Sequence, residues 1–527
     1  MAEAAEQETR QTTVEVRDVK WTTCIIVGAG PTGLMLAEEL ALAGVPCRIL
    51  ERRSEESNLT RAFGVHARTL EVLDMRGMAD ELVPQGLRVP EVRPQLGKMR
   101  LRLRLNHPES HFPYVLIVSQ ARTEALLEAR ARKLGVEIVR GAEVVGLRQD
   151  ETGVEVLVEG PDGTWRERAE YMVGCDGAHS TVRELLGVGF VGSAYDTHIM
   201  LADLRLSSEE LSRSVNAYPG RDGIVLLPPF GDGWYRAVVW DRKREHVPLE
   251  EPLGFEEVQE SLSRISGTDF GMQEMRWSTR FLSERRQAER YRIGEVFLAG
   301  DAAHVHSPLG ALGMNTGIQD AMNLGWKLAA VVQVWGPGWL LDSYHTERHP
   351  VGRQALRLTD LLQRITVAPA PVRAVRPYLA RLLLGLKPVQ RALRRRISGL
   401  SIAYPPLRGE RAHHWTGRRI PDVAVGNSRL YELMRGGRFV LFDRTGDGEL
   451  ARTVEKGFSD RVDVVQVPAA TTPNWPEVTL IRPDGYAAWA SDAQAISERL
   501  SAGRAALRHW CGSASAREKR HQAGSVR

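Results

Sequence analysis

The chain has 527 residues and a nearly balanced charge, with 70 Lys and Arg against 66 Asp and Glu. At about 100–200 residues per domain, this length predicts about three domains. The composition of 43% hydrophobic and 26% charged residues is typical of globular proteins and excludes collagen-like and wholly disordered chains. A formal net charge of +4 over the whole chain gives no reason to expect a nucleic-acid partner.

The cysteine and hydropathy patterns exclude further classes of protein. The four cysteines are far apart and form no C-x-x-C pair, which excludes a disulfide framework and a zinc ribbon and favours a reducing, cytoplasmic compartment. No run approaches the ~18 consecutive apolar residues of a membrane span, so we expect no stable membrane association. The polar ends, residues 1–20 and 513–527, are predicted to be disordered.

The first structured segment is predicted to be a βαβ unit. Residues 24–27, Cys-Ile-Ile-Val, form a short apolar run that is typical of a strand buried in a parallel sheet. A helix over 31–43 and a strand over 46–50, ending in Glu51, follow it. The next elements are expected in this order: a helix over 123–134, a strand over 136–140, a meander over 144–168 and a strand over 171–175.

The predicted secondary structure changes in character twice in the rest of the chain. Residues 190–285 alternate short strands with Pro- and Gly-rich turns, which predicts a separate antiparallel sheet. A strand over 296–299 and helices over about 317–400 return to the first unit. A new unit with three strand candidates begins after Pro405 and Pro406. We therefore expect one domain built from 21–190 and 286–400, a second over 191–285, and a third over 405–512.

A glycine-rich motif lies between the first predicted strand and helix: Gly28-Ala-Gly30-Pro31-Thr32-Gly33. The first glycine permits a tight turn, the second lets the backbone approach a pyrophosphate at the helix N-terminus, and the third lets helix and strand pack closely. Glu51, 23 residues after Gly28, can accept from ribose hydroxyls, which disfavours NADP and leaves NAD and FAD. An incidental glycine turn is disfavoured because strand, helix and distal acid occur together.

Two later motifs decide between NAD and FAD. Asp176-Gly-Ala-His-Ser180-Thr-Val-Arg183 follows one predicted strand, and Gly300-Asp301-Ala-Ala-His304 follows another and leads into Pro308-Leu-Gly310-Ala-Leu-Gly313-Met314-Asn315. With these motifs in this order, residues 22–365 resemble the single-component FAD-dependent aromatic hydroxylases, typified by para-hydroxybenzoate hydroxylase. Stretches at 61–71, 119–124, 315–327 and 482–489 are more similar to the bacterial enzymes that oxygenate polycyclic aromatic polyketides (anthracycline, angucycline and tetracycline tailoring).

The resemblance implies an α/β fold. A Rossmann-like FAD-binding domain (21–190 and 286–400) would be interleaved with an antiparallel-sheet substrate domain (191–285), and a C-terminal thioredoxin-like domain (405–512) would follow. This last domain lacks any C-x-x-C, so it cannot perform dithiol chemistry. Its expected role is packing, with assembly into a homo-oligomer left open.

The resemblance also implies non-covalent FAD contacts, at Gly28, Gly30, Pro31, Thr32, Gly33, Glu51, Arg52, Arg61, Gln120, Asp176, Asp301, Pro308, Gly310, Gly313, Met314 and Asn315. A carboxylate such as Asp301, just past a strand, can accept from a ribitol hydroxyl, and residues 308–313 would lay backbone along the flavin ring. From the residues alone, Asp176 could instead cap the helix near Thr181. Arg61 and Gln120 could equally be ordinary surface residues.

The chemistry implied by the resemblance is hydroxylation of a polycyclic aromatic polyketide, in antibiotic biosynthesis, through a flavin C4a-hydroperoxide formed with O2 and NADPH or NADH. Arg52, which matches an arginine that can face the flavin in relatives, and His66 are candidates to support the hydroperoxide or a substrate phenolate. Substrate contacts are expected on the antiparallel sheet, although aromatic residues on a sheet are more often core. The candidates are Phe230, Tyr235, Arg236, Trp240 and Trp277.

One departure and several alternatives remain. The family often has Gly-Gly-Gln-Gly where this chain has Gly310-Ala311-Leu312-Gly313, a change expected to affect substrate chemistry more than FAD binding. Baeyer–Villiger insertion on the same scaffold and a redox-silent FAD-binding protein are the alternative functions. His304 and His306 have no third ligand nearby, so no metal site is expected. A basic stretch over 373–396 is interpreted as an exposed helix in preference to a membrane-surface helix.

Overall fold

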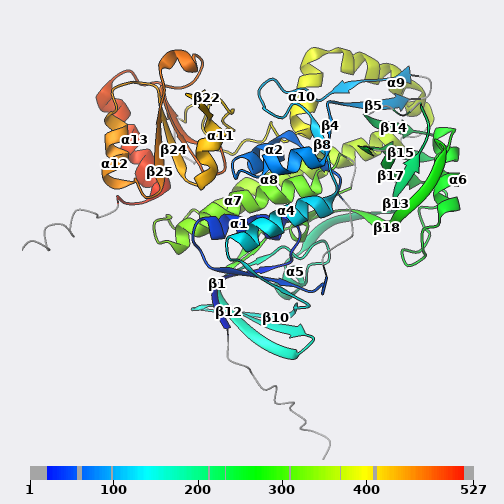
Figure 1. The fold of residues 1–527 in the computed structure, drawn as a ribbon, viewed down its shortest axis with the longest axis horizontal. Coiled ribbons are helices and arrows are strands. Elements are labelled where there is room, and N and C mark those ends of the chain that lie inside the picture. Colours follow the sequence, from blue (N-terminus) through cyan, green and yellow to red (C-terminus); the bar gives the residue numbers. More distant parts are fainter. Residues whose placement is uncertain are drawn as a thin grey trace, which may run out of the picture.

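A computed structural model describes residues 20–55, 62–96, 99–209, 211, 214–231, 233–307, 310–367, 370–406 and 412–514. The ends that were predicted to be disordered lie almost wholly outside these residues. Two long helices, α7 (Gly313–Val332) and α8 (Asp342–Val367), cross the middle of the molecule. Figure 1 shows a parallel sheet below them, an antiparallel sheet at one end and the C-terminal unit at the other.

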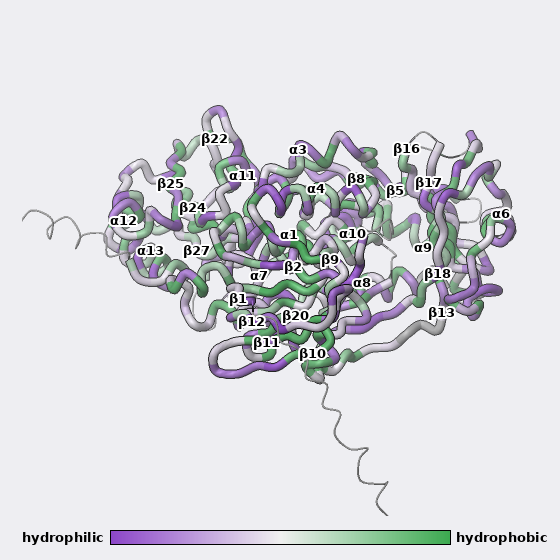
Figure 2. Tube along the Cα trace, turned by 60° about the horizontal axis from the view of Figure 1, so that its bottom comes forward, coloured by the Kyte–Doolittle hydropathy of each residue, from purple (hydrophilic) through white to green (hydrophobic). Residues whose placement is uncertain are grey.

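The parallel sheet is built around β1 (Lys20–Val27), which pairs in parallel with β2 and β12. Its strand order is β10-β11-β12-β1-β2-β9, with β20 beside β12 and β19 beside β20. The predicted apolar run over 24–27 is the buried half of β1, and Figure 2 colours this part of the sheet as hydrophobic. The other strands are β2 (Cys47–Glu51), β9 (Glu137–Arg140), β10 (Glu143–Asp150), β11 (Gly153–Gly160), β12 (Gly163–Gly174), β19 (Arg292–Ile293) and β20 (Val296–Leu298).

One strand prediction in this sheet was wrong. The end of the meander and the strand over 171–175 form a single strand, β12. Its first half pairs antiparallel with β11, and its second half pairs in parallel with β1 and β20. The half-exposed first part alternates polar and apolar residues whereas the buried second part does not, and this change of pattern suggested two strands.

Helices cover the parallel sheet and complete the βαβ unit. The predicted helix over 31–43 is α1 (Pro31–Leu42), which packs against α4 (Gln120–Lys133) and α7. A Cβ at Gly325 of α7 would lie 2.5 Å from the Cβ of Glu39, so the small residue permits this close approach. Shorter helices are α2 (Ala67–Asp74), α3 (Ala79–Leu82) and α5 (Thr181–Leu185).

The antiparallel sheet has ten strands, ordered β21-β18-β13-β17-β15-β14-β5-β6 with β7 and β16 at its side. It departs from the prediction at β14 and β5, which pair in parallel. Its body is the sheet predicted over residues 190–285, but β5 to β7 come from residues 91–104 and β21 from beyond the predicted range. The strands are β5 (Glu91–Leu96), β6 (Met99–Arg100), β7 (Leu103–Arg104), β13 (Phe190–Leu206), β14 (Val215–Pro219), β15 (Gly223–Leu227), β16 (Pro229–Gly231), β17 (Trp234–Asp241), β18 (Met272–Ala288) and β21 (His304–Val305).

This sheet has two different apolar faces. One face packs against α6 (Phe255–Ser266), around Val225, Ala237 and Val239. The other face carries Ile199, Leu201 and Val238, and its cluster includes Ala311 at the start of α7. A small three-stranded sheet, β3 (Gly64–Val65), β8 (Val115–Ile117) and β4 (Leu87–Val89), contributes to the second cluster. The second face therefore points toward the glycine-rich turn that opens α7.

The C-terminal unit contains a four-stranded sheet ordered β25-β24-β26-β27. Strands β24 and β25 are parallel, and β26 is antiparallel to both β24 and β27. All four cysteines of the chain are free thiols. No helix within the described ranges is both long enough and apolar enough to span a bilayer. The elements are β22 (Ala424–Val425), β23 (Ser428–Arg429), α11 (Leu430–Leu433), β24 (Phe439–Asp443), α12 (Glu449–Gly457), β25 (Val462–Gln466), β26 (Val478–Ile481), β27 (Ala487–Ser491) and α13 (Ile496–Cys511).

A buried ionic cluster fixes this unit to the central helices. Arg482, only 1% exposed, donates to both carboxylate oxygens of Glu347 at 2.7 and 2.9 Å and also pairs with Asp484. Lys327 of α7 donates to Glu347 at 2.7 Å. Burial alone would raise the pKa of Glu347, but Arg482 and Lys327 lower it to about 2. The cluster thus joins α7, α8 and the C-terminal unit. Its charged groups are buried, so water cannot take the place of a lost partner.

We expect Arg482→Met to lower the free energy of unfolding by about 3–5 kcal/mol, because it leaves two buried carboxylates without their main cation. Arg452→Met is the matched control: this arginine is 54% exposed and pairs with the exposed Glu449, so its removal should cost less than about 1 kcal/mol. Urea unfolding of both variants measures the difference. Equal losses in the two would contradict the role given to the buried cluster.

Candidate cofactor and substrate site

The glycine motif brings three segments into close contact. Gly28 has a φ of +104°, and a Cβ there would lie 2.5 Å from the carbonyl oxygen of Cys175, at the end of β12. A Cβ at Gly33 would clash with the carbonyl oxygen of Gly28. Only glycine fits either position, so β1, β12 and the first turn of α1 approach as the motif predicts.

Gly30 is different because its surroundings are open. A Cβ added there would meet no described atom within 4 Å. The residue is the N-cap of α1, with Pro31 at the first helical position. Backbone NH groups at a helix N-terminus together with open space are what a bound pyrophosphate requires. The residues present therefore fit the phosphates of a dinucleotide.

Glu51 holds the end of β2 against this loop. It is 5% exposed, and its carboxylate accepts from the backbone NH of Ala29 at 2.7 Å and from Nε of Arg53 at 2.8 Å. Burial raises the pKa of this carboxyl, but the hydrogen bonds from Arg53 and Ala29 outweigh it and lower the pKa. Arg52, the sequence candidate, is exposed. Arg53, which the sequence analysis missed, is the arginine that contacts Glu51.

Thr32 connects the glycine motif to the second half of the domain. A Cβ at Gly300 would lie 2.5 Å from Oγ1 of Thr32, and one at Gly317 in α7 would clash with the same atom. Two glycines therefore make room for this one side chain. Asp301 is exposed next to this contact, with Oδ1 3.7 Å from where a Cβ on Gly313 would lie. The two predicted motifs thus meet at the N-terminus of α7.

Asp320 positions the loop that carries Asp301, and the sequence analysis did not single it out. This fully buried carboxylate accepts from the backbone NH of Gly300 at 3.2 Å, from Nε2 of His304 at 2.6 Å and from Nε of Arg348 at 2.6 Å. Burial alone would raise the pKa of Asp320, but Arg348 and His304 have the larger effect, so its pKa is lowered. An acid on an otherwise buried helix was the available signal, since a buried charge needs a partner.

Asn315 and His66 fix the turn that opens α7. The Asn315 amide donates to the carbonyl oxygens of Gly64 and Ala311 at 2.8 and 2.7 Å, and its oxygen accepts from the backbone NH of His66 at 2.8 Å. Nε2 of His66 lies 2.8 Å from the carbonyl oxygen of Gly310. Burial lowers the pKa of His66, so the neutral ring is favoured. His66 therefore contacts the turn directly.

Other predicted cofactor residues have protein partners. Asp176 accepts from the hydroxyl of Ser180 at 2.6 Å and from the backbone NH of Val182 at 3.0 Å. It thus contacts the first turn of α5, whose N-cap residue is Ser180. Gln120 accepts from the backbone NH of Ala62 at 2.9 Å. Met314 is partly buried against the main core. Arg61 and Pro308 lie outside the described residues.

The predicted substrate residues divide between the two faces of the antiparallel sheet. Phe230, Trp240 and Trp277 belong to the cluster that includes Ala311. Arg236 is fully buried, donates to Asp203 at 2.5 Å and lies 4.7 Å from the Trp277 ring centroid. Tyr235, one residue earlier on β17, packs on the α6 face instead. Strand alternation therefore separates Tyr235 from the other four candidates.

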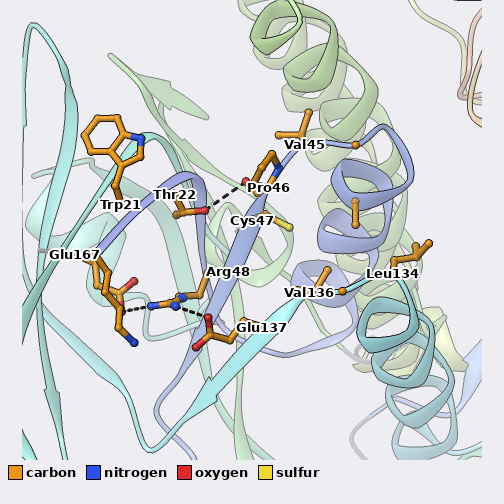
Figure 3. A pocket seen from close by; sticks show the side chains of 14 residues that line it. Trp21, Thr22, Val45, Pro46, Cys47, Arg48, Leu134, Val136, Glu137 and Glu167 are labelled. Atoms are coloured by element: carbon orange, nitrogen blue, oxygen red, sulfur yellow. Dashed lines mark hydrogen bonds and ion pairs between the residues drawn. The ribbon is translucent and has the colours of Figure 1, made fainter.

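A surface pocket of about 420 Å³ lies elsewhere, at the amino-terminal ends of β1 and β2 (Figure 3). Trp21, Thr22 and Arg48 line it, and Arg48 pairs with Glu167 and Glu137 across it. Nucleotides bind at the carboxyl ends of parallel strands. This pocket is therefore separate from the glycine loop.

Comparison with known proteins agrees with this geometry. Residues 21–359 match the family model described as an FAD binding domain, and residues 413–514 match the one described as the C-terminal region of aromatic-ring hydroxylases. Rifampicin monooxygenase of Streptomyces venezuelae is 42% identical over 500 residues, covering 93% of this chain and 99% of that protein. Dialkyldecalin synthase of Streptomyces rugosporus is 34% identical, covering 93% and 99%.

A solved structure, the OxyS anhydrotetracycline hydroxylase from Streptomyces rimosus, has the same fold over nearly the whole chain. It is 38% identical, with a TM-score of 0.82, and the match covers 94% of this chain and all of that one. The matched FAD-binding domain confirms FAD as the cofactor, and the open space at Gly30 agrees with it. The chain belongs to the FAD-binding aromatic-ring hydroxylase family, among relatives that include the tetracycline and rifampicin monooxygenases.

Proposed function

We propose that this protein is a flavin monooxygenase that uses NADH or NADPH and O2 to hydroxylate a multi-ring aromatic polyketide. The observation that carries the proposal is the apolar face of the antiparallel sheet, whose cluster includes Ala311 at the turn opening α7. Phe230, Trp240 and Trp277 give this face large planar surfaces, which suit flat aromatic ligands. Relatives named for rifampicin and anhydrotetracycline support the substrate class.

The chain's residues would bind and orient FAD. The oxygen-transfer chemistry belongs to FAD when it is bound. Gly30 and the start of α1 would hold the pyrophosphate, Glu51 the ribose, and Asp301 a ribitol hydroxyl. The N-terminus of α7 favours negative charge beside the ring. Arg52 stays the candidate for contact with substrate, whereas His66 acts through the turn that it contacts and is a positioning residue.

Turnover against a panel tests the proposal. The panel consists of rifampicin, anhydrotetracycline and an angular tetracyclic phenol. Each compound is mixed with the holoprotein and NADH or NADPH, and the rate of nicotinamide oxidation is measured. We expect at least one compound to stimulate oxidation and to gain one oxygen atom by mass spectrometry. A lactone or ester product would favour Baeyer–Villiger insertion over hydroxylation. No stimulation by any multi-ring phenol would contradict a monooxygenase function.

A second candidate function is that of an FAD-binding protein whose flavin is not turned over. The similarity to dialkyldecalin synthase favours it, as does the structure of the Diels-Alderase PyrE3, which is 33% identical with a TM-score of 0.76. Such a protein would be yellow as purified and would not consume NADH or NADPH with any member of the panel. The same assay therefore separates the two candidates.

We also infer that the C-terminal unit is thioredoxin-like. The order β25-β24-β26-β27, with β24 and β25 parallel, supports this topology. Cys511 is the one cysteine after residue 405, and burial raises its pKa above the ordinary thiol value. Dithiol chemistry therefore has no second thiol in this unit, and the unit's role is to pack on α7 and α8 through the Arg482 cluster.

The glycine loop offers a paired test of FAD binding. Gly30→Ala should leave the melting temperature of the apoprotein nearly unchanged, because its Cβ meets no described atom, but should weaken FAD affinity by about tenfold or more by filling the pyrophosphate space. Gly33→Ala should instead lower the melting temperature, because its Cβ clashes with Gly28. Calorimetry and FAD titration measure both. Unaltered FAD affinity in Gly30→Ala would contradict the site.

Asp301 gives a second test of the same site. Asp301→Ala should raise the dissociation constant for FAD by about 10- to 100-fold, because it removes a charged hydrogen-bond acceptor. Asp342→Ala, which removes another exposed acid at the start of α8, is the matched control and should bind FAD normally. Absorbance near 450 nm after gel filtration reports the flavin content. A full flavin band in Asp301→Ala would argue against the contact.

A further inference from the structure

Helix α9 (Ala370–Gly385) carries an unusual set of exposed apolar side chains. Nearly half of the large apolar side chains that are highly exposed in the described part of the chain lie between residues 372 and 386, and their exposed fractions range from 41% to 70%. Figure 1 shows α9 and α10 (Lys387–Ile397) at the edge of the molecule, beside β5 and β14. The seven side chains are Val372, Val375, Tyr378, Leu379, Leu382, Leu383 and Leu386.

Six of these side chains, Val372 to Leu383, form one stripe along α9, and Leu386 lies between α9 and α10. The spacing of the six by three and four residues places them within an arc of about 140° at ~100° per residue. Leu384, on the opposite side of α9, packs with Leu393 and Ile397 against the cluster that includes Trp277 and Ala311. The helix pair therefore covers the proposed substrate face with its inner side. The side chains of the outer stripe are exposed and belong to no core cluster of the described residues.

The charges of the segment that carries the stripe have a single sign. Residues 361–409 contain no Asp or Glu. Arg394 donates to Asn106 at 3.1 Å and Arg395 pairs with Glu109 at 3.0 Å, so these two contact the body of the protein. The other cations of the segment whose side chains are described are exposed. They are Arg364, which pairs with Asp360 at 3.0 Å, and Arg381, Lys387, Arg391 and Arg396.

We propose that the outer face of α9 docks on an anionic phospholipid surface. An apolar stripe flanked by Arg and Lys, with no acids, is the pattern of a helix that lies in the membrane interface. A second copy of this chain is the poorer occupant, because two acid-free basic segments would meet across the stripe and repel each other. Docking would bring the substrate side of the molecule next to the lipid, where multi-ring aromatic compounds partition.

The basic stretch was predicted to be an exposed helix in preference to a membrane-surface helix, and the structure does place exposed helices there, with their inner side on the sheet. The proposed lipid contact departs from that preference because of the outer side of α9. An exposed helix of that kind has a polar outer face, whereas α9 turns valines and leucines outward. The expected binding is peripheral and reversible, because one short amphipathic helix buries little apolar area. It is independent of which substrate the enzyme oxygenates.

Vesicle sedimentation of the holoprotein tests the proposal. We expect the wild type to bind vesicles of equimolar phosphatidylcholine and phosphatidylglycerol at low salt, and to bind pure phosphatidylcholine at least about tenfold more weakly. Leu379→Ser with Leu382→Ser should weaken binding by about tenfold or more. Arg381→Gln with Lys387→Gln should weaken binding to the anionic vesicles alone. Both double variants should keep their flavin and melting temperature, since all four side chains are exposed.

The matched control changes exposed apolar residues elsewhere. Leu433→Ser with Ile496→Ser alters side chains that are 39% and 50% exposed in the C-terminal unit, and it should bind vesicles as the wild type does. Light scattering after gel filtration is run in parallel. A wild type that ignores anionic vesicles would overturn the proposal. A dimer that the α9 variants convert to monomer would overturn it in favour of a second copy.

Discussion

The buried carboxylate of Asp320 is the interaction on which the cofactor site depends. A carboxylate without water costs several kcal/mol unless it is paired, and Asp320 meets this cost through the Gly300 backbone, His304 and Arg348. These partners come from the loop after β20 and from α8, so one side chain of α7 aligns three segments. The position of Asp301 at the N-terminus of α7 follows from that alignment.

The same interaction links the cofactor loop to the C-terminal unit. Arg348 also donates to the hydroxyl of Tyr404 at 3.2 Å, and the ring of Tyr404 lies 4.4 Å from that of Tyr486. Tyr486 follows the turn that carries Arg482, whose partner Glu347 precedes Arg348 on α8. Polar networks of this kind specify one arrangement because a partly satisfied network is costly. The C-terminal unit therefore contacts the helices that hold the loop carrying Asp301.

Local patterns in the sequence predicted the βαβ unit and the motifs, because a glycine turn and a helix start depend on adjacent residues. Non-local contacts were not predictable in this way. Asp320 and Arg348 are 28 residues apart, and nothing in their spacing joins them. Strands β5 to β7 enter the antiparallel sheet from residues 91–104. The face on which Tyr235 lies was also undecided, since alternation separates two faces but only the assembled sheet shows which one α6 covers.

This chain has Ala311-Leu312 where the family often has Gly-Gln, and the alanine changes what the backbone can adopt without cost. Ala311 has a φ of +53°, a left-handed conformation that glycine adopts freely and alanine at a cost of about 1 kcal/mol. Asn315 retains this conformation by donating to the Ala311 carbonyl, and Gly64 opposite has no Cβ where the methyl group approaches. The usual Gly-Gln is thus replaced by a methyl group facing Gly64 and a Leu312 that is 7% exposed. An amide side chain is thus exchanged for a buried apolar one, next to the residue that joins the cluster on the sheet.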